Sequence, residues 1–201
     1  MLGKLRWLLI VGIVALIAVV PVVCYRDVYA HNKRLREVDP GKFYRCGQLT
    51  ADGFREAVAR YHIRTVINVQ DEYPDPDVEV CFFSAETVKE SDLCKKLGVR
   101  YVYMPPDLIP RHLIPEQRPE AIDKFLSLMD DTSAYPVLIH CRAGLHRTGV
   151  LTAVYRMEYD QWTPEETIRE VKANGFGEWQ CTSANDYIKQ YILTYRRGIR
   201  K

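Results

Sequence analysis

The ten residues His140–Gly149 constrain the fold of this chain more than any other segment. They read His-Cys-Arg-Ala-Gly-Leu-His-Arg-Thr-Gly, follow the apolar run Pro136–His140, and precede Val150–Met157, which is apolar enough to form a buried helix. In a turn between a strand and a helix, the amides and the positive end of the helix dipole point toward one place and attract an anion. The segment therefore predicts an α/β domain with an anion-binding turn.

Four residues of this turn indicate its chemistry. We expect Cys141 to be a nucleophilic thiolate at neutral pH, because the amides and a nearby guanidinium stabilise negative charge on the sulfur. Arg147 can fold back and hold two oxygens of a phosphoryl group with its planar fork. Gly144 lets the backbone turn with a positive φ. Thr148 can place its hydroxyl beneath the sulfur, where it eases release of the thiolate.

The rest of the turn completes a phosphate-binding loop, and we expect the ring of His140 to order it by resting against neighbouring backbone. The expected loop consists of Arg142, Ala143, Gly144, Leu145, His146 and Arg147. The alternative is a buried cysteine in a structural turn with surface arginines. Cysteine, glycine, arginine, threonine and a second glycine at fixed spacing after a strand favour the phosphate site.

The pattern His-Cys-x5-Arg-Thr-Gly at His140–Gly149 resembles the signature of the protein-tyrosine and dual-specificity phosphatase superfamily. The chain from about Lys42 to Lys189 is similar to a compact dual-specificity catalytic domain. Phe43–Leu49 resembles the first segment of bacterial and plant-fungal atypical members, with Cys46 in place of their serine. The resemblance implies a largely parallel central sheet flanked by helices. It also implies a two-step hydrolysis through a phosphocysteine, with no metal and no organic cofactor.

The family places a general acid, an aspartate, on a loop some thirty residues before the cysteine. Asp107, in the segment Met104–Pro110 after an expected strand end, is our candidate for this acid. The alternative is a turn aspartate that follows two prolines. Glu116 and Glu120 belong to the next expected helix, where we expect solvated surface.

The resemblance implies that the substrate is a phosphorylated protein. His146–Gly149 also matches the plant-fungal branch that acts on inositol pyrophosphates, although that branch carries more lysine where this loop has Arg142 and Leu145. An inositol phosphate or a phosphoinositide is therefore a second substrate class. Two further alternatives are a weakly catalytic module that docks phosphorylated partners and a rhodanese-type sulfurtransferase. The Thr-Gly pair fits the phosphatase signature better than the sulfurtransferase.

Composition limits the other function classes. The formal charge of the 201-residue chain is +2, with 28 basic and 26 acidic residues, so we expect no nucleic-acid partner. The 6 cysteines are scattered without a metal-ligand spacing, so we expect no zinc site. The length allows one domain with a short appendage.

The appendage is an N-terminal apolar segment. No charged residue occurs from Trp7 to Tyr25, and a helix over these residues is roughly 28 Å long, close to the ~30 Å thickness of the hydrocarbon core. We expect a short tail at 1–6 and a single transmembrane anchor at 7–25. A cleaved signal peptide that ends at Val28-Tyr29-Ala30 is the alternative.

The residues after the span indicate its orientation. Arg26, Lys33, Arg34 and Arg36 follow the span closely, which favours a cytoplasmic catalytic domain. We expect 26–41 to be a solvated juxtamembrane linker, with basic residues that can touch anionic headgroups as the alternative. The catalytic domain should then occupy 42–201.

Strand and helix patterns alternate through that domain. We expect strands at Phe43–Arg45, Thr65–Val69, Arg100–Met104 and Val137–His140. We expect helices at Ala51–Tyr61, Ala85–Leu97 and Pro115–Asp130, another from Pro164 that stops by Gly175, and a last one after Ser183.

Overall fold

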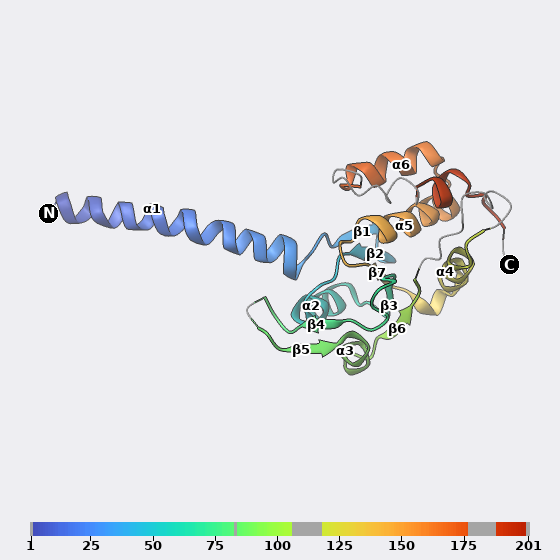
Figure 1. Cartoon of the computed structure of the whole chain (residues 1–201), viewed down its shortest axis with the longest axis horizontal. Coiled ribbons are helices and arrows are strands. Elements are labelled where there is room, and N and C mark those ends of the chain that lie inside the picture. Colours follow the sequence, from blue (N-terminus) through green and yellow to red (C-terminus); the bar gives the residue numbers. More distant parts are fainter. Residues whose placement is uncertain (1, 83, 106–117, 177–187, 200–201) are drawn as a thin grey trace.

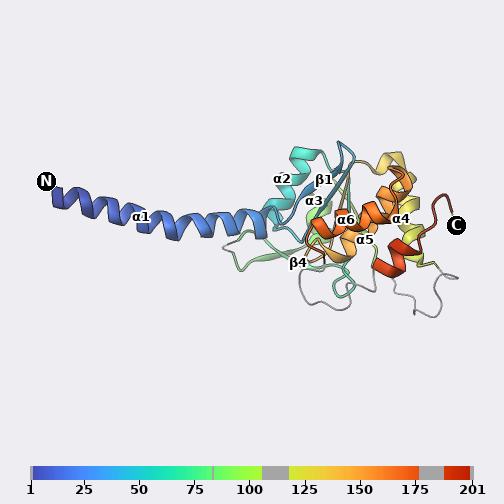
Figure 2. The same ribbon diagram turned by 90° about the horizontal axis from the view of Figure 1, so that it is seen from above.

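The computed structural model describes residues 2–82, 84–105, 118–176 and 188–199. One long helix, α1 (Leu2–Tyr25), projects away from an α/β domain, and the chain termini lie at opposite ends of the molecule (Figures 1 and 2). The strands of the domain are β1 (Arg36–Asp39), β2 (Phe43–Cys46), β3 (Thr65–Asn68), β4 (Asp77–Glu79), β5 (Thr87–Lys89), β6 (Arg100–Tyr103) and β7 (Val137–His140). Its α-helices are α2 (Ala51–Tyr61), α3 (Glu90–Lys96), α4 (Glu120–Asp130), α5 (His146–Tyr159) and α6 (Pro164–Ala173).

The main sheet has five strands in the order β1-β2-β7-β3-β6. Strands β2, β7, β3 and β6 run parallel, and only β1 is antiparallel to its neighbour. Strands β2, β3 and β7 are buried along their whole length, as expected for parallel strands that are covered on both faces. The expected largely parallel sheet flanked by helices is confirmed.

Two apolar cores cover the two faces of this sheet. One contains Phe125 of α4 and Leu151 of α5, together with Ile139 of β7. The other contains Phe54 of α2 and Leu93 of α3, together with Leu138 of β7. Because adjacent residues of β7 point to opposite faces, this central strand joins the two cores.

The carboxyl ends of β2, β7 and β3 meet at one edge of the sheet. In the register, Cys46 lies beside His140, and Asn68 lies beside His140 on the other side. The segments that follow these three strands therefore come together at this edge. The expected phosphate-binding loop is the middle one of the three.

Local signals explain the helix ends that the sequence predicts well. The Thr50 hydroxyl accepts a hydrogen bond from the Gly53 amide at the start of α2. Thr163 and Glu166 form a reciprocal capping box at the start of α6, with Pro164 at the first helical position. Helix α6 ends at Ala173, within the expected limit.

Three expectations about the elements are wrong. Arg36–Asp39, which we placed in the linker, forms β1 and pairs with β2, so the folded region starts before Lys42. Thr87–Lys89, which we placed in a helix, forms β5 and pairs with β4, and α3 begins only at Glu90. In both cases the partner strand is close in the chain, but the strand itself is short and mostly polar, so its sequence shows no strand pattern.

The third error concerns the helix expected at Pro115–Asp130. Helix α4 starts at Glu120, after Pro119, and residues 115–117 lie outside the described part. The helix expected after Ser183 is described only as a π-helical turn, η4 (Ile188–Leu193).

The N-terminal helix has the length and composition of a membrane span. The most apolar 18-residue stretch of Gly3–Tyr25 has a mean hydropathy of 3.0, and none of that stretch is buried against the domain. A further π-helical turn, η1 (Arg26–His31), continues it into the domain. A signal sequence would have the same properties, so this helix does not by itself distinguish an anchor from a leader.

Candidate active site

The loop from Cys141 to Arg147 forms a tight turn between β7 and α5. Gly144 has a φ of +71°, and a Cβ there would lie 2.5 Å from the Gly47 amide nitrogen and 2.6 Å from the Cys46 carbonyl group. The Gly144 amide donates a hydrogen bond to Cys141 Sγ at 3.2 Å. Cys141 is only 4% exposed. The turn thus directs at least one amide at the sulfur, which stabilises negative charge there.

Arg45, which we did not predict as a site residue, supports the loop from β2. Its Nη2 donates to the Gly144 carbonyl at 2.9 Å, and the Leu145 carbonyl lies at 3.5 Å. The residue is 3% exposed, and burial lowers the pKa of its guanidinium to about 10. Arg45 therefore fixes the carbonyl of Gly144, the residue whose amide contacts the sulfur. The only signal in the sequence was its place in the segment Phe43–Leu49.

A buried polar network lies beneath the loop. His140 Nε2 and Glu90 Oε1 are 2.6 Å apart, and both side chains are 0% exposed. The second Glu90 oxygen accepts from Gln48 Nε2 at 2.9 Å, and Gln70 Nε2 donates to Gln48 Oε1 at 2.6 Å. We expected His140 to rest on neighbouring backbone, but the structure shows that a carboxylate from α3 holds its ring.

Arg147 lies at the start of α5 with its guanidinium bound by two carboxylates from the segment after β3. Nη1 and Nη2 donate to Glu72 at 2.8 and 2.9 Å, and Asp71 lies 2.5 Å from Nη2. The hydrogen bonds from Arg147 lower the pKa of Glu72 to about 2, whereas burial raises the pKa of Asp71. A phosphate that binds Arg147 must share this guanidinium with Asp71 and Glu72.

Thr148 and His146 complete the described part of the loop. Thr148 is fully buried, and its Oγ1 has no hydrogen-bond partner among the residues that the structure describes. The hydroxyl thus makes no bond to the sulfur here. The His146 ring packs edge-on against Phe176 with centroids 5.1 Å apart, and burial followed by the charge of Arg147 lowers the pKa of His146.

The structure brings together most of the residues that we predicted. His140, Cys141, Gly144, Arg147 and Thr148 all lie in or beside one turn at the carboxyl edge of the sheet. Asp107, the expected general acid, and Glu116 lie outside the described residues. Glu120 pairs with Lys124 along α4 at 3.0 Å. Within the described ranges, no group of three His, Cys, Asp or Glu side chains is placed to hold a metal ion.

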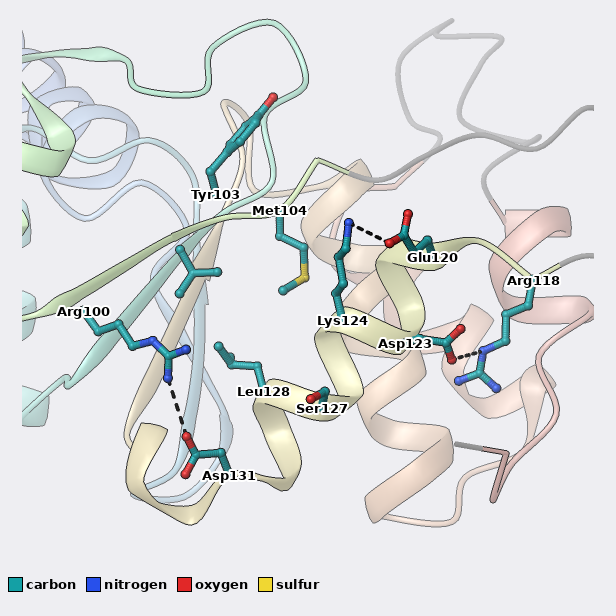
Figure 3. Close-up of a pocket in the computed structure, with 11 residues that line it drawn as sticks. Arg100, Tyr103, Met104, Arg118, Glu120, Asp123, Lys124, Ser127, Leu128 and Asp131 are labelled. Atoms are coloured by element: carbon teal, nitrogen blue, oxygen red, sulfur yellow. Dashed lines mark ion pairs between the residues drawn. The ribbon is translucent and has the colours of Figure 1, made fainter. Parts of the chain in front are cut away.

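A large cavity lies elsewhere, between β6 and α4 (Figure 3). It has a volume of about 880 Å³, and its walls carry three ion pairs: Arg118–Asp123, Lys124–Glu120 and Arg100–Asp131. Its described lining contains no cysteine and no phosphate-binding turn. We therefore place the chemistry at the loop after β7 and not in this cavity.

Comparison with known proteins agrees with this placement. A family model described as "DSP-PTPase phosphatase fused to NAD+ Kinase" matches residues 17–186. The chain belongs to this phosphatase family. An inositol diphosphatase of Arabidopsis thaliana, DSP3, is 25% identical over 171 residues, which cover 85% of this chain and 76% of that protein. The chain is thus a cysteine-based phosphatase of the dual-specificity type.

Two solved phosphatases share the fold. The catalytic core of the PP-IP phosphatase SIW14 from S. cerevisiae superposes with a TM-score of 0.55 at 19% identity, covering 78% of this chain and 84% of that one. TpbA from P. aeruginosa superposes with a TM-score of 0.56 at 19% identity, covering 81% and 90%. At 19% identity, the likeness between this chain and the two solved phosphatases concerns the fold alone.

Proposed function

We propose that this phosphatase is held at a membrane by α1 and hydrolyses phosphate monoesters through a covalent intermediate on Cys141. The observation that carries the proposal is the crowded turn at Gly144. Its amide contacts the sulfur, and the turn leads directly into the N-terminus of α5. Such a turn binds a phosphoryl group and supports a thiolate at the same place.

The reaction has two steps. In the first, Cys141 Sγ attacks phosphorus, an S–P bond forms, the P–O bond to the alcohol or phenol breaks, and Asp107 donates a proton to the leaving oxygen. In the second, Asp107 takes a proton from water, the water oxygen attacks phosphorus, and the S–P bond breaks. The products are inorganic phosphate and the regenerated thiolate.

Arg147 and the loop amides supply the electrostatic part of this reaction. The planar guanidinium of Arg147 holds two equatorial oxygens and stabilises the charge that develops on them. Thr148 has an unused buried hydroxyl beside the turn, which can donate to the sulfur as the S–P bond breaks. His140 and Glu90 hold the loop in place from below.

Phosphorylated protein is the substrate class that the dual-specificity type implies. The second class, inositol phosphates and phosphoinositides, is favoured by the relative named inositol diphosphatase, which matches 85% of this chain. Arg142 is an exposed cation in the loop and suits either class.

Phosphate release from an activated aryl phosphate, a phosphotyrosine peptide and a phosphothreonine peptide tests this proposal. Cys141→Ser should abolish release from all three. Asp107→Asn should slow the alkyl ester, phosphothreonine, by about 10²–10⁴-fold and the activated aryl ester far less, because general acid catalysis matters most for a poor leaving group. Turnover by Cys141→Ser close to that of the wild type would rule out the mechanism. A uniform small effect of Asp107→Asn would assign the acid to another residue.

A further inference from the structure

The segment that joins α1 to the domain is attached to the phosphate loop itself. The Gly47 amide donates to the Lys33 carbonyl at 2.7 Å, and Arg34 Nη1 donates to the Ala143 carbonyl at 3.0 Å. The Gln48 amide in turn donates to the Arg142 carbonyl at 3.2 Å. The chain thus passes from the apolar helix to the edge of the phosphate loop at Arg142 and Ala143, which we call the rim.

Other contacts fix the helix end to the domain. Tyr25 is helical and leads without a break into η1, and its ring packs edge-on against Phe82 with centroids 6.2 Å apart. At the end of η1, His31 Nε2 lies 2.7 Å from Glu56 of α2. These contacts hold the junction against the domain, so the phosphate loop lies close to the end of α1.

The height of the loop beyond α1 can be estimated from the length of η1. It has six residues, so it spans on the order of 10 Å beyond Tyr25. A bilayer is ~40–45 Å thick with its headgroups and ~30 Å without them, which leaves roughly 5–8 Å of headgroups on each side. If α1 spans the hydrocarbon core, the phosphate loop lies at the outer boundary of the headgroup layer.

The rim of the loop on this side is cationic. The stem of Lys33 lies across Gly47, where a Cβ would come within 2.8 Å of it and 3.1 Å of the Ala143 backbone. Burial, and then the charges of Arg34 and Arg142, lower the pKa of Lys33, so the three cations are close neighbours. No carboxylate of the described ranges lies within ion-pair distance of Lys33 or Arg142.

Acidic groups of the β4–β5 hairpin share a cavity with Lys33. Asp77 and Glu79 line a cavity of about 440 Å³ together with Lys33, and Asp77 already pairs with Lys89 at 2.9 Å. Among the described residues, neither of these carboxylates pairs with Lys33, so the rim keeps its positive charge beside the loop. The formal charge of the whole chain is only +2, yet Lys33, Arg34 and Arg142 lie together beside the active site.

We propose that the substrate is a phosphate monoester on the headgroup of a membrane lipid, and that Lys33, Arg34 and Arg142 bind the anionic groups beside the scissile phosphate. This inference rests on the proposed function and names its substrate class. A soluble inositol phosphate offers the same anionic groups, so the height of the loop is what favours the lipid source. Each basic residue near an anionic surface contributes about 1 kcal/mol of binding.

The test uses the full chain in phosphatidylcholine vesicles that carry either phosphatidic acid or a phosphatidylinositol monophosphate. The soluble arm supplies the same headgroups on short-chain, water-soluble analogues in the presence of the same vesicles. The variant inserts five whole turns of helix, eighteen residues built on Glu-Ala-Ala-Ala-Lys, after Tyr25. This insertion lifts the domain by about 27 Å without rotating it.

We expect the insertion to lower phosphate release from the vesicle lipid about tenfold or more, because the tethered site no longer reaches the headgroups. Release from the soluble analogue should stay within about twofold, because the domain itself is unchanged. Lys33→Met should lower release from the lipid about fivefold, the equivalent of ~1 kcal/mol, and the exposed Lys96→Met should have no effect. The insertion should leave hydrolysis of an aryl phosphate within about twofold, because the domain itself is unchanged.

Several results would overturn the inference. One is that the wild type releases no phosphate from either vesicle lipid. Another is that the insertion variant releases as much phosphate from the lipid as the wild type does. A third is that the wild type prefers the soluble analogue, which would indicate a free inositol phosphate as substrate. Hydrolysis of an aryl phosphate by the same samples separates this failure from failure of the proposed function. If Cys141→Ser abolishes aryl hydrolysis while the lipid results are negative, only the substrate class is wrong.

Discussion

At the scale of single residues, Gly144 combines two constraints. Its φ of +71° is costly for other residues, and a Cβ would overlap the backbone of Cys46 and Gly47. We predict that Gly144→Ala lowers kcat/KM by about 10²-fold, because the amide on Cys141 shifts by a large fraction of an ångström. It should also reduce the free energy of unfolding by roughly 1–3 kcal/mol. Steady-state kinetics and urea denaturation measure the two effects.

Gly98→Ala is the matched control. Gly98 has a similar φ of +69°, but no atom lies within 4 Å of the position of its Cβ. We expect a stability loss of about 1 kcal/mol, from the left-handed conformation alone, and unchanged kinetics. Equal kinetic effects of the two substitutions would show that the turn at Gly144 has no special part in catalysis.

Glu72 gives a second prediction, because it binds the arginine that must receive the phosphate. We predict that Glu72→Gln tightens inhibition by inorganic phosphate up to about fivefold, the effect of removing roughly 1 kcal/mol of repulsion between partly exposed charges. Weaker inhibition would instead mean that Glu72 mainly positions Arg147.

The pH dependence of Glu72 gives a related prediction. Because the folded-state pKa of Glu72 is lowered to about 2, its ion pair with Arg147 is complete above the ordinary carboxyl pKa of ~4.3 and is lost as the pH falls through about 2. Titration of Glu72 should therefore cause no step in phosphate inhibition between pH 5 and 8.

The residues that the sequence predicts are those whose neighbours in the chain carry the signal. Cys141, Gly144 and Arg147 share one short turn, and its spacing alone indicates a phosphate loop. Arg45 and Glu90 act on that turn from positions 99 and 50 residues away in the sequence, so only the fold reveals them. Neither has an unusual local pattern.

At the scale of elements, the capping box of α6 is a local device with a measurable contribution. The Thr163 hydroxyl accepts from the Glu166 amide at 3.2 Å, and Glu166 Oε2 accepts from the Thr163 amide at 2.8 Å. We predict that Thr163→Ala lowers the free energy of unfolding by about 1 kcal/mol. Ser127→Ala, an exposed hydroxyl within α4, is the control and should not lower it. Equal losses would contradict the cap.

Element prediction succeeds where a boundary has its own chemistry and fails where a strand is short and mostly polar. Both ends of α6 follow from Thr163, Pro164 and Gly175. The strand β1 is short and charged, and only its pairing with β2 makes it a strand. The three residues of β5 likewise form a strand only through pairing with β4, and the sequence near Thr87 does not predict this pairing.

At the scale of the whole molecule, α1 should hold the phosphatase in the membrane. We predict that the full chain sediments with membranes and resists alkaline carbonate extraction, because its apolar residues have no other place to be buried. A chain that begins at Arg26 should be soluble and keep its aryl phosphatase activity. A mature protein that begins at His31 would instead identify α1 as a cleaved leader.

The sequence predicts the span from composition, but not how it joins the domain. We expected residues 26–41 to be a solvated spacer because they are polar. In the structure, the Lys33 carbonyl accepts from the Gly47 amide beside the phosphate loop, and Arg34 donates to Ala143 in the loop. Arg36–Asp39 joins the sheet. Polar residues form this junction because their partners are backbone carbonyls and amides, which leave no pattern in the sequence.

The central claim is that Cys141 carries the phosphoryl group, and rapid acid quenching during turnover of an activated aryl phosphate tests it most directly. Peptide mass spectrometry of the quenched protein should find one added phosphoryl group on the peptide that contains Cys141. Cys141→Ser should still bind phosphate, because Arg147 and the loop amides remain, but no phosphoryl group should accumulate on this peptide. Full turnover by Cys141→Ser, or a phosphoryl group trapped only on another residue, would contradict the account.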